Sequence, residues 1–106
     1  MHLRLLFFGF LLFIPMSSHA EIIDLVCTDA TGFSSTFSID TSRGEVLHYG
    51  HQMRKVWIDK NEIAFVNNLE GKEWFHSINR TNGNMSVQAP DKTILHLKCE
   101  SAKPKF

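Results

Sequence analysis

Residues 73–89 are EWFHSINRTNGNMSVQA, a stretch that predicts a β-hairpin within an all-β domain. Asn82-Gly83 is the strongest turn signal in the chain, because this pair accepts the positive φ angles of hairpin turns. Residues Glu73 to Asn79 before the turn are expected to form one strand. The apolar residues after it alternate with polar ones: Met85, Val87 and Ala89. Such alternation is typical of a strand with one buried face.

Similar turn signals recur on both sides of this hairpin. They are Asp40 to Gly44, Asp59 to Asn61, Leu69 to Lys72 and Ala89 to Lys92. The segments between them are short and largely alternating, and none shows a helical period. The sequence therefore predicts an antiparallel meander of seven to eight strands, either a closed barrel or a two-layer sandwich.

Residues 1–20 are predicted to be a cleavable secretory signal. A basic start ending at Arg4 precedes the apolar run Leu5 to Ile14, and Ser18-His19-Ala20 offers small residues for cleavage. The apolar run is about half of the roughly 20 residues that a membrane-spanning helix needs. We therefore expect a periplasmic or secreted protein with no membrane span after cleavage, a β-domain over residues 21–100 and a flexible tail over 101–106.

The two cysteines, Cys27 and Cys99, are predicted to form a disulfide in an oxidising compartment. Cys27 shares a strand face with Leu25, and Cys99 shares one with Leu97, so both thiols are expected on the apolar side. The bridge would join the first and last strands and remove two exposed sheet edges. A domain this small gains most from such a link, because it buries only about 60% of its unfolded surface.

Charge indicates no nucleic-acid partner. After removal of Arg4 with the signal, 10 basic residues stand against 11 acidic ones. No basic stripe is present, so nucleic-acid binding is not expected.

The histidines are candidate metal ligands, although their spacing is not typical of a metal site. His48 and His51 flank a Tyr-Gly turn and could both reach a metal ion, with His76 or His96 completing the site. No third ligand stands at a diagnostic spacing, so neither a metal nor a cofactor is expected. Both cysteines are used by the bridge and no serine sits in a Gly-flanked elbow, so the sequence does not predict an enzyme.

Four aromatic residues of the middle strands are candidate partner-binding residues: Tyr49, Trp57, Trp74 and Phe75. Trp74 and Phe75 are adjacent, so they point to opposite faces of a strand, and one of them is expected to be partly exposed. Large exposed aromatic side chains commonly anchor protein interfaces.

The run Ile78-Asn79-Arg80-Thr81-Asn82-Gly83 lies between a first and a last strand that each carry a cysteine. This layout resembles small exported bacterial single-disulfide β-proteins of unknown function, many of which carry an Ile-Asp/Asn-Arg-x-Ser/Thr-Gly hairpin. Here Asn82 stands where that pattern runs straight into the glycine. The resemblance implies an envelope β-domain and no particular activity.

The sequence thus predicts a non-catalytic binding or accessory protein of the periplasm or extracellular space that contacts another protein, as an inhibitor or envelope accessory does. The alternative is a small-ligand carrier with a lipocalin-like barrel interior. A carrier needs an unfilled cavity, whereas the many Phe and Trp residues predict a filled barrel. A small metal-binding protein or a hydrolase is the third alternative.

Overall fold

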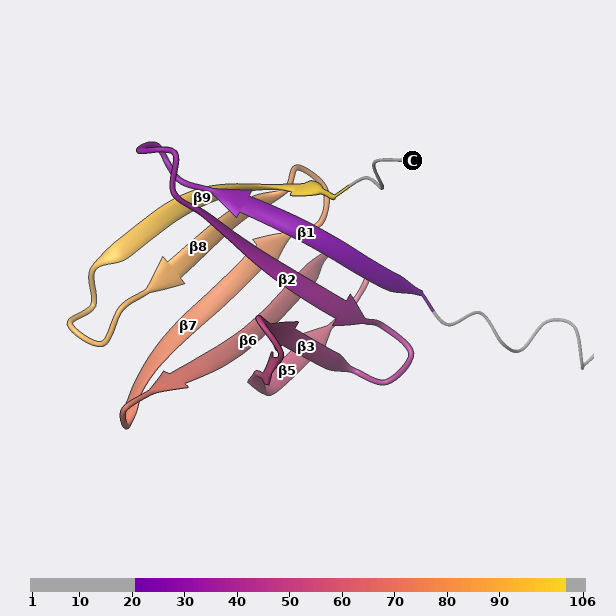
Figure 1. Ribbon diagram of the computed structural model, residues 1–106, viewed down its shortest axis with the longest axis horizontal. Coiled ribbons are helices and arrows are strands. Elements are labelled where there is room, and N and C mark those ends of the chain that lie inside the picture. Colours follow the sequence, from indigo (N-terminus) through magenta and orange to yellow (C-terminus); the bar gives the residue numbers. More distant parts are fainter. Residues whose placement is uncertain (1–20, 103–106) are drawn as a thin grey trace, which may run out of the picture.

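The computed structural model describes residues 21–102, all of them in strands, turns and loops (Figure 1). The nine strands are β1 (Ile22–Thr28), β2 (Ser34–Asp40), β3 (Glu45–His48), β4 (His51–Gln52), β5 (Arg54–Ile58), β6 (Glu62–Leu69), β7 (Lys72–Asn79), β8 (Asn84–Gln88) and β9 (Ile94–Ser101). The predicted signal at 1–20 and residues 103–106 lie outside this range. Within it, no helix is long and apolar enough to cross a membrane.

All nine strands form one antiparallel sheet in the order β4-β3-β2-β1-β9-β8-β7-β6-β5. Each strand pairs with its neighbour in sequence, except that β1 pairs with β9 and that β4 and β5 do not pair. The sheet curls into a nearly closed barrel whose open seam lies between β3–β4 and β5 (Figure 1). At the seam the Met53 N–H donates to the Val46 carbonyl at 2.8 Å. The predicted all-β meander is confirmed, with the two-residue β4 as the additional strand.

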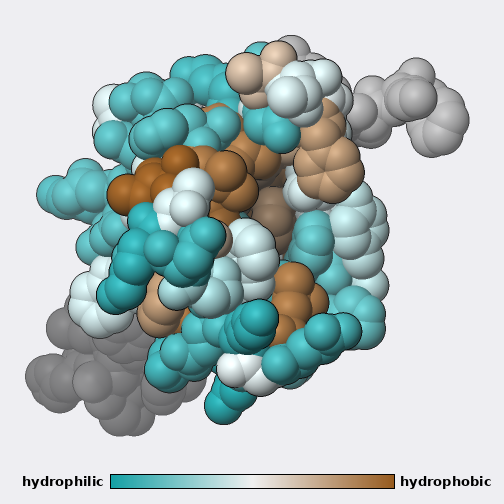
Figure 2. Space-filling model, turned by 90° about the vertical axis from the view of Figure 1, so that its left-hand side faces the viewer, coloured by the Kyte–Doolittle hydropathy of each residue, from teal (hydrophilic) through white to brown (hydrophobic). Residues whose placement is uncertain are grey.

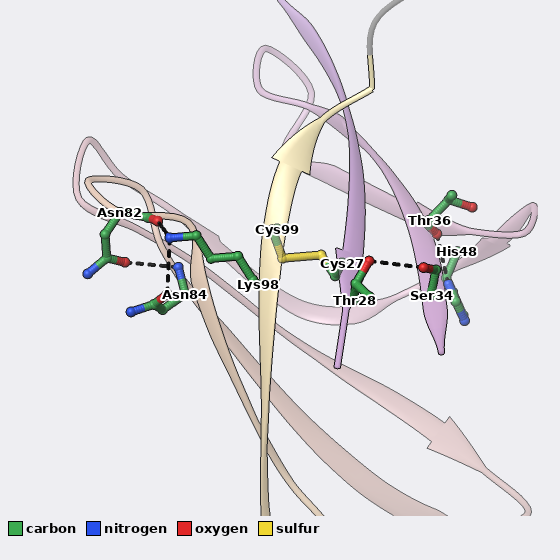
Figure 3. The surroundings of a disulfide bond; sticks show 9 residues. All are labelled: Cys27, Thr28, Ser34, Thr36, His48, Asn82, Asn84, Lys98 and Cys99. Atoms are coloured by element: carbon green, nitrogen blue, oxygen red, sulfur yellow. Dashed lines mark hydrogen bonds between the residues drawn. A yellow bond between two sulfur atoms is a disulfide. The ribbon is translucent and has the colours of Figure 1, made fainter. Parts of the chain in front are cut away.

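The disulfide joins β1 to β9, as predicted. Cys27 lies directly opposite Cys99 in the ladder, and the two sulfur atoms are 2.09 Å apart. Figure 3 shows the bridge crossing between these strands, with Lys98 reaching from β9 to Asn82 in the β7–β8 turn. Both cysteines are buried, so the link belongs to the core.

The β7–β8 turn packs directly on the backbone of β9. The Gly83 carbonyl accepts a 2.7 Å hydrogen bond from the Cys99 N–H, and Gly83 has a φ of +79°. A Cβ atom at this position would lie 2.6 Å from the Cys99 carbonyl oxygen. Of the predicted Asn-Gly pair, only the glycine adopts a positive φ, because the turn spans four residues and closes from Gly83 N–H to the Asn79 carbonyl.

The core lies inside the barrel and is built from alternating strand positions. Its largest fully buried side chains are Phe65, Ile39, Met85, Val46 and Cys27. Partly buried apolar side chains pack against them: Ile23, Leu25, Val56, Ile58, Trp74 and Leu97. Outside the bulge in β5, the inward and outward positions of the strands therefore follow the alternation in the sequence.

The end of the domain differs from the predicted boundary. Ser101 is still part of β9 and pairs with Leu25 of β1. The Ala102 N–H then donates to the Asp24 carbonyl at 2.8 Å. The β1–β9 ladder thus continues past residue 100, where a tail was expected to begin.

Candidate functional site

One end of the barrel, which we call the mouth, holds a cavity of about 460 Å³. The β1–β2 turn and the beginning of β9 border it, and Figure 2 shows apolar side chains gathered around a hollow on this face. Its wall is formed by Phe33, Ser35, Phe37, His76, Met85, Val87, Ile94, Leu95 and Leu97, with Asp29, Ala30, Thr31 and His96 at the edge. The aromatic residues were predicted to fill the barrel completely, but they leave this end of it open.

The β1–β2 turn places Phe33 at the edge of the mouth. Asp29 Oδ1 accepts hydrogen bonds from the Thr31 N–H (2.9 Å), the Thr31 hydroxyl (2.6 Å) and the Phe33 N–H (3.1 Å). The Thr31 hydroxyl, followed by backbone N–H groups, holds the pKa of Asp29 below its ordinary value. This carboxylate is thus occupied by its own turn, a use that aspartate commonly has at such positions.

Large apolar side chains remain exposed around the mouth. Phe33 is 66% exposed and Leu95 is 46% exposed, although Leu95 occupies the same strand face as buried Cys99. No other element covers this end among the described residues, so the apolar face of β9 reaches solvent here. The mouth therefore combines an apolar wall with an apolar edge.

Aromatic rings and imidazoles pack together inside the barrel beneath the mouth. Phe37 is central: its ring centroid lies 4.6 Å from that of His48, 5.3 Å from Phe65 and 5.8 Å from His76. His76 also stacks on Phe65 at 4.7 Å with an interplanar angle of 15°. These contacts fix the orientation of the His76 ring.

His76 is the main polar group of the cavity wall. Its Nδ1 lies 3.2 Å from the Trp74 carbonyl oxygen. Because a carbonyl oxygen can only accept, Nδ1 carries the proton and Nε2 has a free lone pair. Burial lowers the pKa of His76 from 6.5 to about 4, so the ring is neutral at physiological pH.

The histidines do not assemble into a metal site in the described part of the chain. His48 and His51 face each other across the β3–β4 pair, but His48 Nδ1 donates to the Thr36 carbonyl at 2.9 Å and its ring stacks on Phe37. His51 and His96 are exposed. Within residues 21–102 no group of three or more His, Cys, Asp or Glu side chains could hold a metal ion.

The four predicted aromatic residues occupy three different places. Trp57 and Phe75 are exposed on the outside of the barrel, where their strands flank β6. Tyr49 is exposed in the β3–β4 turn and packs against His48. Trp74 is partly buried and packs against the core, so Phe75 is the exposed member of the adjacent pair.

A second hollow, which we call the outer groove, lies on the outside of β6, β7 and β8 and has a volume of about 450 Å³. Val66 forms part of the floor of this groove. Its side chain is buried, although it faces away from the core cluster. Phe75 is its largest exposed wall residue, and Lys55 stands at the side with an ion pair to Glu73 at 3.4 Å.

Sequence reasoning missed the cavity itself. Ser35 gave the one available signal, because it is a small polar residue at an inward position of β2, two residues before buried Phe37.

Comparisons of the chain with protein-family models, with curated proteins and with solved structures gave no match. The resemblance to exported single-disulfide β-proteins therefore stays a prediction, and the geometry of the mouth carries the functional argument.

Proposed function

We propose that the protein is a non-catalytic binding protein of the periplasm or extracellular space, and that it holds a small, mainly apolar molecule in the mouth of its barrel. The observation that carries this proposal is the cavity of about 460 Å³ with an apolar wall. Small-molecule sites commonly have volumes of about 300 to 1,000 Å³, apolar walls and a few placed polar groups. The mouth has these properties.

The exposed edge of the mouth supports the same proposal. Leaving large apolar side chains in water costs about 25 cal/mol for each Å² that could be buried. Phe33 and Leu95 carry this cost in the free protein, and a ligand seated between the β1–β2 turn and β9 would cover both. Covering these two side chains with a ligand would therefore contribute favourable free energy to binding.

The location is part of the proposal. The Cys27–Cys99 disulfide is consistent with an oxidising compartment. The predicted signal at residues 1–20 would deliver the chain to the periplasm or the outside of the cell. In such a compartment a protein of this kind would carry or sequester molecules that dissolve poorly in water.

Two measurements test the proposed ligand site. Native mass spectrometry of protein purified from its own host should show an additional small molecule bound to part of the population. The neutral fluorescent probe N-phenyl-1-naphthylamine should bind the ligand-free protein, and Leu95→Glu should weaken this binding by at least about tenfold, because the probe would have to desolvate a carboxylate in the mouth.

The matched control for the charge is Ile22→Glu. Ile22 is also a large exposed apolar residue, but it lies on β1 outside the set that lines the mouth. This variant should bind the probe as the wild type does. Equal loss in the two variants, or no probe binding by the wild type, would contradict the proposal.

Contact with a protein partner is the second candidate function. Trp57 and Phe75 are 61% and 46% exposed, and both lie on the outer face around Ala64 and Val66. Exposed aromatic side chains around a groove are typical anchors of protein interfaces. We propose this face as the contact surface of an inhibitor-like or envelope accessory protein.

Alanine substitutions separate this second candidate from the first. Trp57→Ala and Phe75→Ala should each lower recovery of a co-purifying protein from the native compartment by at least tenfold, the effect of one interface anchor of about 1.4 kcal/mol or more. Leu69→Ala is the control, because Leu69 is also exposed but lies at the end of β6 opposite Lys72, away from Ala64 and Val66. Unchanged recovery in both aromatic variants, with the domains still folded, would rule out this surface.

A further inference from the structure

We infer that the mouth selects uncharged ligands that carry a hydroxyl or N–H group, and that His76 Nε2 and the Ser35 hydroxyl orient this group. This inference rests on the proposed function, since it names the ligand class of the same cavity. It follows from which polar atoms of the wall are already bonded and which remain free.

His76 Nε2 is free and reaches the cavity. Nδ1 is bonded to the Trp74 carbonyl, and no hydrogen bond to Nε2 occurs among the described residues. The same residues contain no buried side-chain nitrogen or oxygen that lacks a partner. Nε2 must therefore be accessible to solvent. His76 borders both the outer groove and the cavity, but its ring packs against Phe37 and Phe65 inside the barrel, so Nε2 opens toward the cavity. Neutral Nε2 accepts a hydrogen bond but cannot donate one.

Ser35 adds the second polar contact. It occupies an inward position of β2 directly opposite Cys27 and lines the same cavity. Its hydroxyl has no hydrogen-bond partner among residues 21–102, and by the same reasoning it is accessible. A hydroxyl both donates and accepts, so Ser35 can satisfy the oxygen of a ligand hydroxyl whose hydrogen is bonded to His76.

The cavity contains no free charge to balance an ionic ligand. Its wall includes no Lys or Arg, and its single carboxylate, Asp29, is held by three hydrogen bonds within the β1–β2 turn. His96 is exposed at the edge rather than inside. An unpaired charged group in an apolar cavity costs far more than a neutral polar group. Carboxylates and ammonium ions are thus disfavoured relative to alcohols, phenols and amides.

The experiment compares three probes of one shape: 2-naphthol, naphthalene and 2-naphthoate, titrated calorimetrically at pH 7 into ligand-free full-length mature protein. In the wild type, 2-naphthol should bind more than about tenfold tighter than 2-naphthoate. For each protein we take the association constant of 2-naphthol divided by that of naphthalene. This ratio should be about fivefold higher in the wild type than in His76→Phe, because one net neutral hydrogen bond changes an equilibrium constant by about this factor. This comparison between proteins cancels the different partitioning of the two probes.

His76→Phe keeps a ring of similar shape against Phe65, and Ser35→Ala is a second, smaller change that should also lower the ratio. His51→Phe is the control, because His51 is exposed on β4 and does not line the cavity. It should keep the wild-type ratio.

The outcomes separate this inference from the proposed function. Equal ratios in the wild type, His76→Phe and Ser35→Ala would overturn the selection of donors while leaving an apolar ligand site. Tightest binding of 2-naphthoate would overturn the selection against charge. Failure of all three probes to bind would contradict the ligand site itself.

Discussion

Replacing both cysteines, Cys27→Ala with Cys99→Ala, is expected to lower the free energy of unfolding by about 4 kcal/mol. The bridge links residues 72 positions apart, so its loss restores a large amount of conformational freedom to the unfolded chain. The loss is a large part of the roughly 5 to 15 kcal/mol by which domains are stable. Urea unfolding followed by tryptophan fluorescence, which Trp57 and Trp74 supply, measures the change.

Reduction of the wild type provides the internal control for this experiment. Fully reduced wild-type protein should unfold at nearly the same urea concentration as the double variant, because both lack the same link. A loss below about 1 kcal/mol in both would show that the β1–β9 ladder holds the barrel closed without covalent help.

Acidification from pH 7 to pH 4 is expected to cost about 3 kcal/mol of stability through His76 alone. Burial lowers its folded-state pKa to about 4, against 6.5 for the unfolded residue. Between these values the unfolded state binds more protons, so the free energy of unfolding falls as the pH falls. The stabilisation is therefore fully present above pH 6.5 and lost as the pH drops toward 4.

Denaturant unfolding at several pH values, compared between the wild type and His76→Phe, isolates this contribution. The difference between the two proteins should change by about 3 kcal/mol across the window, while the effects of the other histidines cancel. Losses at lower pH belong to carboxylates such as Asp29 and Asp59, whose pKa values are lowered by hydrogen bonds. Parallel pH profiles would show that His76 is not held neutral by burial.

The sequence predicted those parts of the fold that depend on local alternation. The inward positions of β1 and β8, the turn at Gly44 and the pairing of Cys27 with Cys99 follow from residue parity and turn chemistry, both of which are visible in a single strand or loop. Strand β4 and the first two residues of β5 were not predicted as strands, because the path of the chain there depends on a bulge near Lys55, which has a φ of +50°. A bulge breaks the parity on which the prediction relied.

The candidate site was predictable only in fragments. His76 was named only as a residue that could complete a metal site, and nothing in the sequence shows that its Nδ1 would be hydrogen-bonded and its Nε2 left free. The cavity is the difference between the volume enclosed by nine strands and the volume of the side chains they contribute. That difference depends on the curvature of the whole sheet, which no local pattern reports.

The seam between β4 and β5 places the two edges of the sheet in the middle of the chain, while the first and last strands, β1 and β9, pair inside the sheet. Proteolytic cleavage beside the exposed pair His51–Gln52 would therefore divide the molecule into two polypeptides, each a contiguous half-sheet. These fragments would stay in register through the β1–β9 ladder and remain covalently connected by Cys27 and Cys99. The two fragments of the nicked protein would therefore migrate as one species until a reductant separated them.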